Sequence, residues 1–196
     1  MIEIDFKKIE LEDKDLITHY FKHHTSRSCE RTFVNVYLWA RFYHVKFAEV
    51  EHTLVFRTED EDGFSFAYPA GEPENVKKAL DVLMVYSKER GVPFLMYTVT
   101  PDNFEYLEKW YPGRFEIEYV EGDADYVYES EKLATLSGKK LHSKRNHVNK
   151  FKIVYADRWS YEPISEDNLE ECVQTGLKWR NENGCEEDEE KNAELC

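Results

Sequence analysis

The chain has 196 residues, of which 41% are hydrophobic and 15% aromatic, and this composition excludes a disordered polymer and indicates a folded globular protein. A formal net charge of −14 excludes non-specific binding of nucleic acid or anionic membranes by the whole surface, so an anionic ligand needs a local positive patch. There is no secretory signal, no apolar run long enough to span a bilayer and no Cys-x-x-Cys pair, so we expect a cytoplasmic protein without a transmembrane segment.

Apolar residues recur at strand or helix spacing through the first third of the chain. The predicted elements are a strand over 2–6, helices over 11–23 and 30–41, and strands over 45–50, 53–58 and 64–68. The polar turn that ends in Asp62-Gly63 favours a hairpin, because Asp-Gly suits the backbone of tight turns. The last three strands are therefore predicted to form an antiparallel meander.

The clearest predicted helix covers residues 73–90, because Pro73 suits its first turn and Gly91 follows its last. The predicted elements after it are a strand over 94–99, a helix that opens at Thr100-Pro101, a strand over 115–119 and a strand near 125–129. This order resembles the GNAT acyltransferase fold. It implies an α/β (α+β) protein with a GNAT-like mixed sheet flanked by helices.

A second series of elements is predicted after residue 130. It consists of a strand over 153–155 and a helix that ends at about residue 182, with Ser165 as its N-cap. Ile9 to Leu16 and Ile164 to Leu169 share a short pattern of Ile, Glu-Asp and Leu before a helix. We therefore expect a first lobe over 1–130, a basic connecting helix over 131–152, and the start of a second, incomplete GNAT-like lobe over 153–196. The acidic run 186–190 would suit the N-terminus of a further helix.

A cationic segment stands out in this acidic chain, because no Asp or Glu occurs from Lys132 to Ala156. On a helix, Leu141, Val148 and Phe151 lie near one side and would anchor it. The flanking faces present cations and amides that suit phosphate or carboxylate. The candidate binding residues are Lys140, Lys144, Arg145, Asn146 and Asn149. The alternative is a basic helix that only balances acidic neighbours within the fold.

The stretch 133–151, which contains Ser137-Gly138-Lys139-Lys140, resembles the hallmark of the phosphatidylglycerol lysyltransferase C-terminal-like family, and residues 32–39 resemble its N-terminal signature. This resemblance implies two GNAT-like lobes and transfer of an aminoacyl group from aminoacyl-tRNA to a lipid or amine acceptor. It implies an anionic partner for the basic helix, such as a phosphate, a tRNA end or a lipid head group. It also makes His147 or His142 candidates for moving protons, since imidazole titrates near neutral pH. The alternative is a non-catalytic lobe that binds an anion or forms an interface.

The turn between residues 68 and 74 is where an acyl-CoA lobe would hold a pyrophosphate on backbone N–H groups. Here it contains Pro69 and Pro73, which lack N–H groups, and Glu72 and Glu74, which would repel a pyrophosphate. We therefore expect no cofactor on this lobe, and acyl-CoA or aminoacyl-tRNA only as a donor of the intact protein.

A metal site is not expected either. His23, His24 and Cys29 could contribute ligands, but the sequence specifies no fourth ligand. The two histidines suit the surface at the end of a helix, and Cys29 suits a small buried position.

Overall fold

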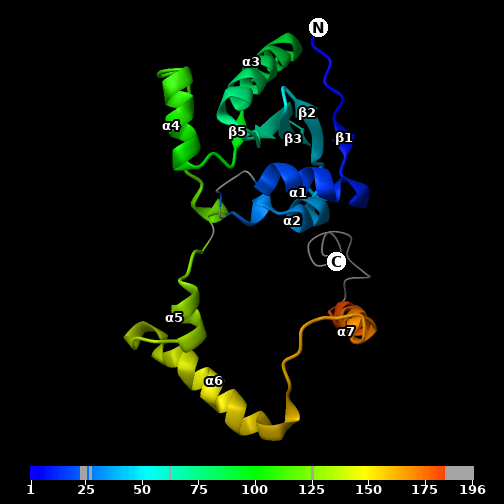
Figure 1. Cartoon of the computed structure of the whole chain (residues 1–196), viewed down its shortest axis with the longest axis vertical. Helices are drawn as coiled ribbons and strands as arrows, with labels where there is room; N and C mark the ends of the chain where they lie inside the picture. The colour runs from blue at the N-terminus through cyan, green and yellow to red at the C-terminus, as the bar shows by residue number, and fades with distance from the viewer. Residues whose placement is uncertain (23–25, 27, 62, 125, 184–196) are drawn as a thin grey trace. The chain divides into compact units, whose positions relative to one another are not determined.

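The computed structural model describes residues 1–22, 26, 28–61, 63–124 and 126–183. It divides into two compact units, Met1–Ala124 and Asp125–Cys196. In chain order (Figure 1) the elements are β1 (Lys7–Lys8), η1 (Leu11–Asp13), α1 (Lys14–Lys22), η2 (Cys29–Arg31), α2 (Phe33–Trp39), β2 (Lys46–Val50), β3 (Thr53–Asp60), β4 (Gly63–Ala67), α3 (Pro73–Arg90), β5 (Met96–Tyr97), α4 (Pro101–Trp110), η3 (Glu121–Asp123), α5 (Ser130–Thr135), η4 (Lys139–Leu141), α6 (His142–Tyr155), η5 (Ala156–Arg158) and α7 (Leu169–Glu182).

The first unit contains a mixed sheet with the strand order β1-β2-β3-β4-β5. The strands from β1 to β4 pair antiparallel, and β4 pairs with β5 in parallel across the α3 connection. A parallel neighbour requires such a crossover, whereas short turns join β2 to β3 and β3 to β4. The antiparallel pair of β1 and β2 is joined by the longer connection that contains α1 and α2. The predicted α/β fold with a mixed sheet flanked by helices is confirmed, and so is the antiparallel meander.

Helix α3 begins and ends at the residues that the sequence predicted. Pro73 lies in its first turn, and Gly91 closes it in the left-handed conformation with φ 70°. Its buried face consists of residues three or four positions apart, namely Val76, Ala79, Leu80, Leu83, Tyr86 and Ser87. This stripe fixes α3 against one face of the sheet.

Helices cover both faces of the sheet (Figure 1). On one face, Ile17 and Phe21 of α1 and Phe33 of α2 share a core with Phe47 and Phe56 of the strands. On the other face, α3 packs on the strands, and α4 adds Leu107 to a cluster that includes Tyr68 and Val76. The parallel strands β4 and β5 therefore lie at one edge of the sheet, and α3 and α4, which follow them, pack together there.

The N-terminal segment differs from the prediction of a strand over 2–6. Only Lys7–Lys8 pair as β1, with Phe47 and Lys46 of β2. The predicted alternation is nevertheless present in burial, since Ile2, Ile4 and Phe6 are half-buried against the core under α3. Apolar contact rather than a strand ladder holds this segment.

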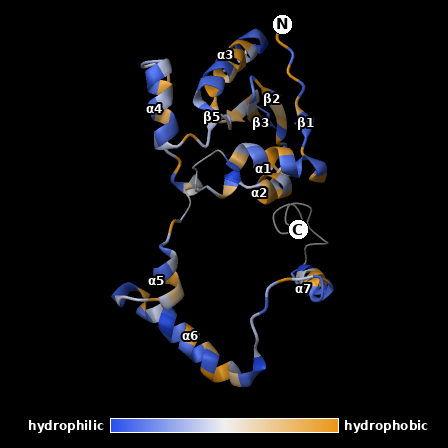
Figure 2. Ribbon diagram, in the orientation of Figure 1, coloured by the Kyte–Doolittle hydropathy of each residue, from blue (hydrophilic) through white to orange (hydrophobic). Residues whose placement is uncertain are grey.

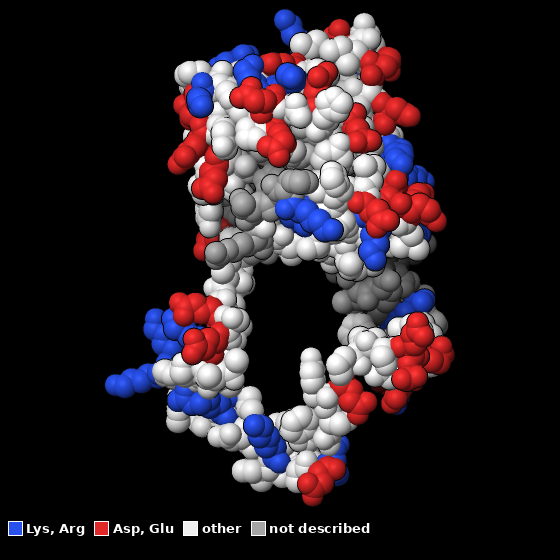
Figure 3. All heavy atoms as spheres, viewed as in Figure 1, with Lys and Arg blue, Asp and Glu red and all other residues white. Residues whose placement is uncertain are grey.

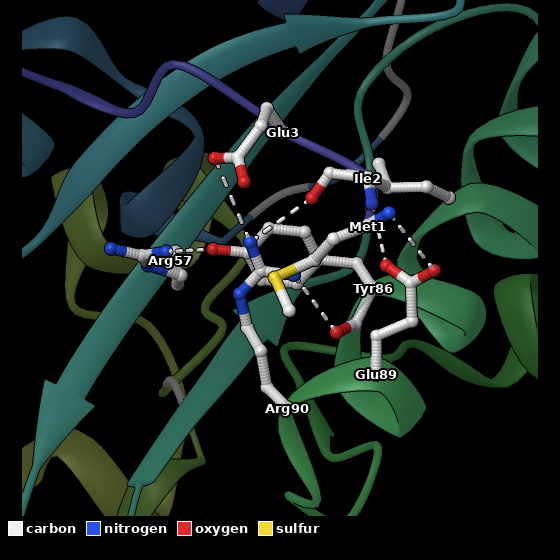
Figure 4. Close-up of polar contacts among 7 residues, drawn as sticks. All are labelled: Met1, Ile2, Glu3, Arg57, Tyr86, Glu89 and Arg90. Atoms are coloured by element: carbon white, nitrogen blue, oxygen red, sulfur yellow. Dashed lines mark hydrogen bonds and ion pairs between the residues drawn. The ribbon is translucent and has the colours of Figure 1, made fainter.

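The end of α3 fastens the segment to the fold (Figure 4). Arg90 donates hydrogen bonds to the Ile2 carbonyl at 3.0 Å and to the Tyr86 carbonyl at 3.3 Å. Its guanidinium lies 3.5 Å from the centre of the Tyr86 ring. Glu89 accepts a hydrogen bond from the Ile2 amide at 2.5 Å and lies 3.8 Å from the N-terminal amine of Met1.

Beside this contact, the buried Arg57 of β3 lies over two aromatic rings. Its guanidinium carbon is 4.3 Å from the Phe6 ring centre and 5.6 Å from that of Phe64. It also donates hydrogen bonds of 2.5 Å to the Tyr86 hydroxyl and to Glu59 (Figure 4 shows the first). Arg57 thus ties the N-terminal segment to β3 and α3 together.

Replacing Arg90 by glutamine is expected to lower the free energy of unfolding by about 1 kcal/mol, because the cation–π contact and the hydrogen bond to Ile2 are lost. Urea unfolding checks this value, and amide hydrogen exchange at residues 2–8 should accelerate. Lys88→Gln, at an exposed position of the same helix, is the matched control. Unchanged exchange at residues 2–8 in Arg90→Gln would contradict the proposed fastening.

The predicted strands over 115–119 and near 125–129 are wrong for the residues that the structure describes. No ladder forms at residues 115–120 or 126–129, although Ile117 and Tyr119 alternate with acids as predicted. Their side chains are 67% and 79% exposed, so no sheet or helix covers them. Position 125 lies outside the described residues.

The second unit contains α5, η4, α6, η5 and α7, and none of its described residues is buried. The predicted strand over 153–155 is wrong, because these residues form the last turn of α6. Ser165 does not cap a helix, since α7 begins at Leu169 with Asn168 before it. The acidic run 186–190 lies outside the described residues. That a second GNAT-like lobe begins at residue 153 stays a prediction.

Candidate functional site

The seven predicted site residues lie in one segment of the second unit. Lys140 belongs to η4 and the other six to α6. Lys140 therefore lies before the α-helix that contains Lys144 and His147, because α6 begins only at His142. Lys and Arg side chains gather over α5 and α6 on the face seen in Figure 3.

A concavity of about 480 Å³ lies at the start of α6. Its lining consists of Gly138, Lys139, His142 and Arg145. It brings together two of the predicted residues, His142 and Arg145. Lys139 and Gly138 were not predicted as site residues, although both belong to the acid-free segment and Gly138 precedes the predicted cations directly.

Arg145 shapes this concavity. Its Nη1 donates to the carbonyl of Leu136 and, at 3.0 Å, to that of Gly138. Gly138 has a φ of 92°, which favours glycine, so the chain can turn sharply before η4. The guanidinium thus holds the turn in place while it also contributes positive charge to the lining.

His142 lies between Arg145 and Asn146. Its Nδ1 is 3.5 Å from Nη2 of Arg145, and its Nε2 is 3.3 Å from the side-chain amide of Asn146. Because a guanidinium only donates, Nδ1 acts as the acceptor in the first contact, and the proton of the neutral ring then lies on Nε2, which cannot accept from the Asn146 amide nitrogen. Asn146 contacts His142 without lining the concavity itself.

The other predicted residues do not line the concavity. Lys140, Lys144, His147 and Asn149 are exposed on η4 and α6. Among the described residues, no carboxylate forms an ion pair with Lys144 or Arg145, and the ion pairs of the second unit join Lys132 to Glu129 and Lys178 to Glu182. The described contacts therefore give no support to a helix that only neutralises acids.

The predicted anchoring face of α6 is not buried. Val148 and Phe151 are 41% and 43% exposed. Phe151 instead contacts two other rings, Tyr155 at 4.9 Å and Trp159 at 5.5 Å between ring centres. In Figure 2 the beginning of α6 is mainly hydrophilic, and apolar residues gather toward its end. The helix therefore has a cationic start and an aromatic end.

The turn of residues 68–73 offers few donors to a pyrophosphate. The amide of Tyr68 donates to Tyr97 at 3.1 Å, and the amide of Ala70 donates to Leu54 at 2.9 Å. Pro69 and Pro73 have no N–H, so only two amides of the turn remain. The turn therefore has fewer N–H groups for a pyrophosphate than a turn without prolines would have.

No metal centre is apparent in the described part of the chain, where no three His, Cys, Asp or Glu side chains come together as a ligand set. His23 and His24 lie outside that part. Cys29 is exposed, so the expectation of a buried cysteine is wrong. None of the helices that the structure describes has both the length and the apolar character needed to cross a bilayer.

Comparison with known proteins gives three findings. Residues 21–195 match the family described as phosphatidylglycerol lysyltransferase, C-terminal. A solved structure of a conserved protein of unknown function from Bacteroides thetaiotaomicron is similar to 98% of the chain, with 33% identity and a TM-score of 0.83. An uncharacterized protein of Mycoplasmoides gallisepticum is 32% identical over 89 residues, or 45% of the chain. The chain covers 64% of the solved relative and 28% of the mycoplasma protein, which is less than two thirds of either.

Proposed function

The chain belongs to the phosphatidylglycerol lysyltransferase C-terminal family, and from this premise we propose that it takes part in aminoacyl transfer from aminoacyl-tRNA to a lipid or amine acceptor. The family match makes it a lysyltransferase-related domain. Because aminoacyl-tRNA is a cytoplasmic donor, the proposal places the chain in the cytoplasm.

The observation that carries the proposal is the cationic concavity at the start of α6. Lys139 and Arg145 line it together with His142, and the first turn of α6 contains no acid. The N-terminus of a helix favours anions, and Arg and Lys are the side chains that bind phosphate in proteins. The proposed ligand is a phosphate near the aminoacylated end of the tRNA.

In the proposed reaction the acceptor nitrogen or oxygen attacks the carbonyl carbon of the aminoacyl ester. A new bond forms to the acceptor, the ester bond to the tRNA ribose breaks, and the acceptor proton passes to the released ribose oxygen, which leaves as a hydroxyl. We assign this proton transfer to His142, because it lies in the concavity. His147 is the second candidate. Lys140, Lys144 and Asn149 would contact the tRNA beyond the concavity.

Lys139→Gln is expected to weaken the binding of aminoacyl-tRNA by about threefold to tenfold and to reduce the salt dependence by about one phosphate contact. Filter binding or fluorescence anisotropy at several salt concentrations measures both. Lys139 suits this test better than Arg145, since loss of Arg145 would also release the turn at Gly138. Lys178→Gln on α7, where the lysine pairs with Glu182, is the control. Equal affinity of Lys139→Gln and the unaltered chain would refute the site.

The second candidate function is a non-catalytic lobe that binds an anion or forms an interface. It is favoured by the exposed apolar residues of the second unit, such as Trp159 and Val173, which are 46% and 48% exposed. A transfer assay with labelled aminoacyl-tRNA separates the two functions. Binding that depends on Lys139 without any transfer would favour the non-catalytic lobe.

A further inference from the structure

The first unit contains a second concavity, which the aminoacyl-transfer proposal does not use. It has a volume of about 590 Å³, within the usual range for small-molecule sites. One wall is the turn after β4, with Gly71, Glu72 and Pro73, and the opposite wall is α4, with Asn103 and Tyr106 among others. We refer to it as the turn–α4 pocket.

Its place in the sheet is where open α/β folds bind ligands. Strands β4 and β5 are the parallel neighbours of this sheet, and α3 and α4 follow them. The carboxyl ends of parallel strands leave a crevice between the connections that follow them. The turn–α4 pocket is lined by the turn after β4 and by α4, which follows β5, so it lies at the carboxyl ends of these two strands.

The floor of the pocket is apolar and aromatic. Tyr68 and Val76 are 3% and 2% exposed, and Tyr106 stands at the wall with its ring 5.3 Å from that of Trp110. Burial, together with the neighbouring Tyr106, raises the pKa of Tyr68 above its ordinary value, so its phenol stays neutral at physiological pH. Aromatic faces of this kind attract cations.

The rim of the pocket carries three carboxylates and one amine, from Glu72, Asp102, Glu105 and Lys109. Among the described residues, none of these four side chains has a hydrogen-bond or ion-pair partner. Their formal sum is two negative charges. The N-termini of α3 and α4 each contribute about half a positive charge, so the balance remains about one negative charge.

We propose that the turn–α4 pocket binds a small organic cation, a primary ammonium on an unbranched carbon chain. The carboxylates of Glu72, Asp102 and Glu105 receive the ammonium, and the carbon chain packs on Val76 and Tyr106. The proline-rich turn, whose Tyr68 and Ala70 amides are used within the fold, leaves few N–H groups for an anion there. This pocket is independent of the site on α6.

The test is an NMR titration of the full chain with cadaverine. We expect saturable shifts of the Gly71, Asn103 and Tyr106 amides. The Glu72→Gln/Glu105→Gln double variant should weaken binding about tenfold, because two exposed carboxylate contacts are lost. Lys109→Gln should tighten binding about twofold to threefold, because it removes the one repelling cation. Added salt should weaken binding.

The matched control is Glu118→Gln, which removes one exposed acid outside the pocket and should leave the affinity unchanged. Equal binding by the double variant and the unaltered chain would mean that cadaverine only follows the overall negative charge, which overturns the proposal. Equal shifts with uncharged 1,5-pentanediol, or binding of coenzyme A at Gly71, would overturn it as well. None of these results bears on tRNA binding at Lys139.

Discussion

Replacing Leu83 by alanine is expected to lower the free energy of unfolding by about 3 kcal/mol, within the range for fully buried leucines. Leu83 is 0% exposed and belongs to the core cluster between α3 and the sheet. Its neighbours there include Val55 and Phe66, which come from two different strands. These strands cannot close around the vacated space without losing their pairing, so a cavity should remain.

Val85→Ala is the matched control for this prediction, because Val85 lies two residues further along α3 but is 44% exposed. Val85→Ala should lower the free energy of unfolding by less than about 1 kcal/mol. Urea unfolding followed by circular dichroism measures both variants, and an unchanged slope would show that the same surface unfolds. A cost for Leu83→Ala as small as that for Val85→Ala would mean that α3 does not form the core described here.

The elements that were predicted correctly are those whose signals are local. Pro73 and Gly91 mark the ends of α3, and the stripe between them repeats at helical spacing. The hairpins from β2 to β4 need only neighbouring residues and short turns. Both kinds of element can be recognised in one short stretch of sequence.

The predictions that failed concern patterns that require a distant partner. Residues 115–119 alternate as a strand should, but a strand forms only when another strand pairs with it. Residues 2–6 alternate equally well and leave Ile4 and Phe6 half-buried, yet pairing is confined to Lys7–Lys8. Alternation therefore predicted the inward side of residues 2–6 but not of residues 115–119, where Ile117 and Tyr119 are exposed, and it predicted a strand ladder in neither segment.

The candidate sites also combine features that the sequence predicts locally with features that depend on how the elements pack. The acid-free run predicted the cationic segment, but the side chains that share a concavity depend on where the helix starts. Because α6 begins at His142, Lys139 joins His142 and Arg145, whereas Lys144 lies outside the concavity. In the first unit the turn's acids were visible in the sequence, but Asp102 and Glu105 join Glu72 only when α4 packs.

Position 71 is expected to have no room for a side chain. The loss of stability caused by Gly71→Ala can be assigned to one neighbour, Thr53. A Cβ there would lie 2.9 Å from Cγ2 and 3.2 Å from Cβ of Thr53, and 3.3 Å from the carbonyl oxygen of His52. Thr53 is fully buried and donates to the Val50 carbonyl at 2.7 Å, so it cannot rotate away freely. Gly71→Ala should therefore cost about 1–3 kcal/mol.

The Gly71→Ala/Thr53→Ser double variant identifies the cause, because serine keeps the hydroxyl that bonds Val50 and removes the methyl that lies nearest. In the Thr53→Ser background, the loss of unfolding free energy caused by Gly71→Ala should be smaller by about 1 kcal/mol or more, because the nearest contact is removed. Alanine also restricts the unfolded chain, which offsets part of the remaining loss. Urea unfolding of the four proteins of this cycle measures the coupling. A cost that is the same in both backgrounds would show that the Thr53 methyl is not the cause. The clash would then be with the Thr53 Cβ or the His52 carbonyl, which serine leaves in place.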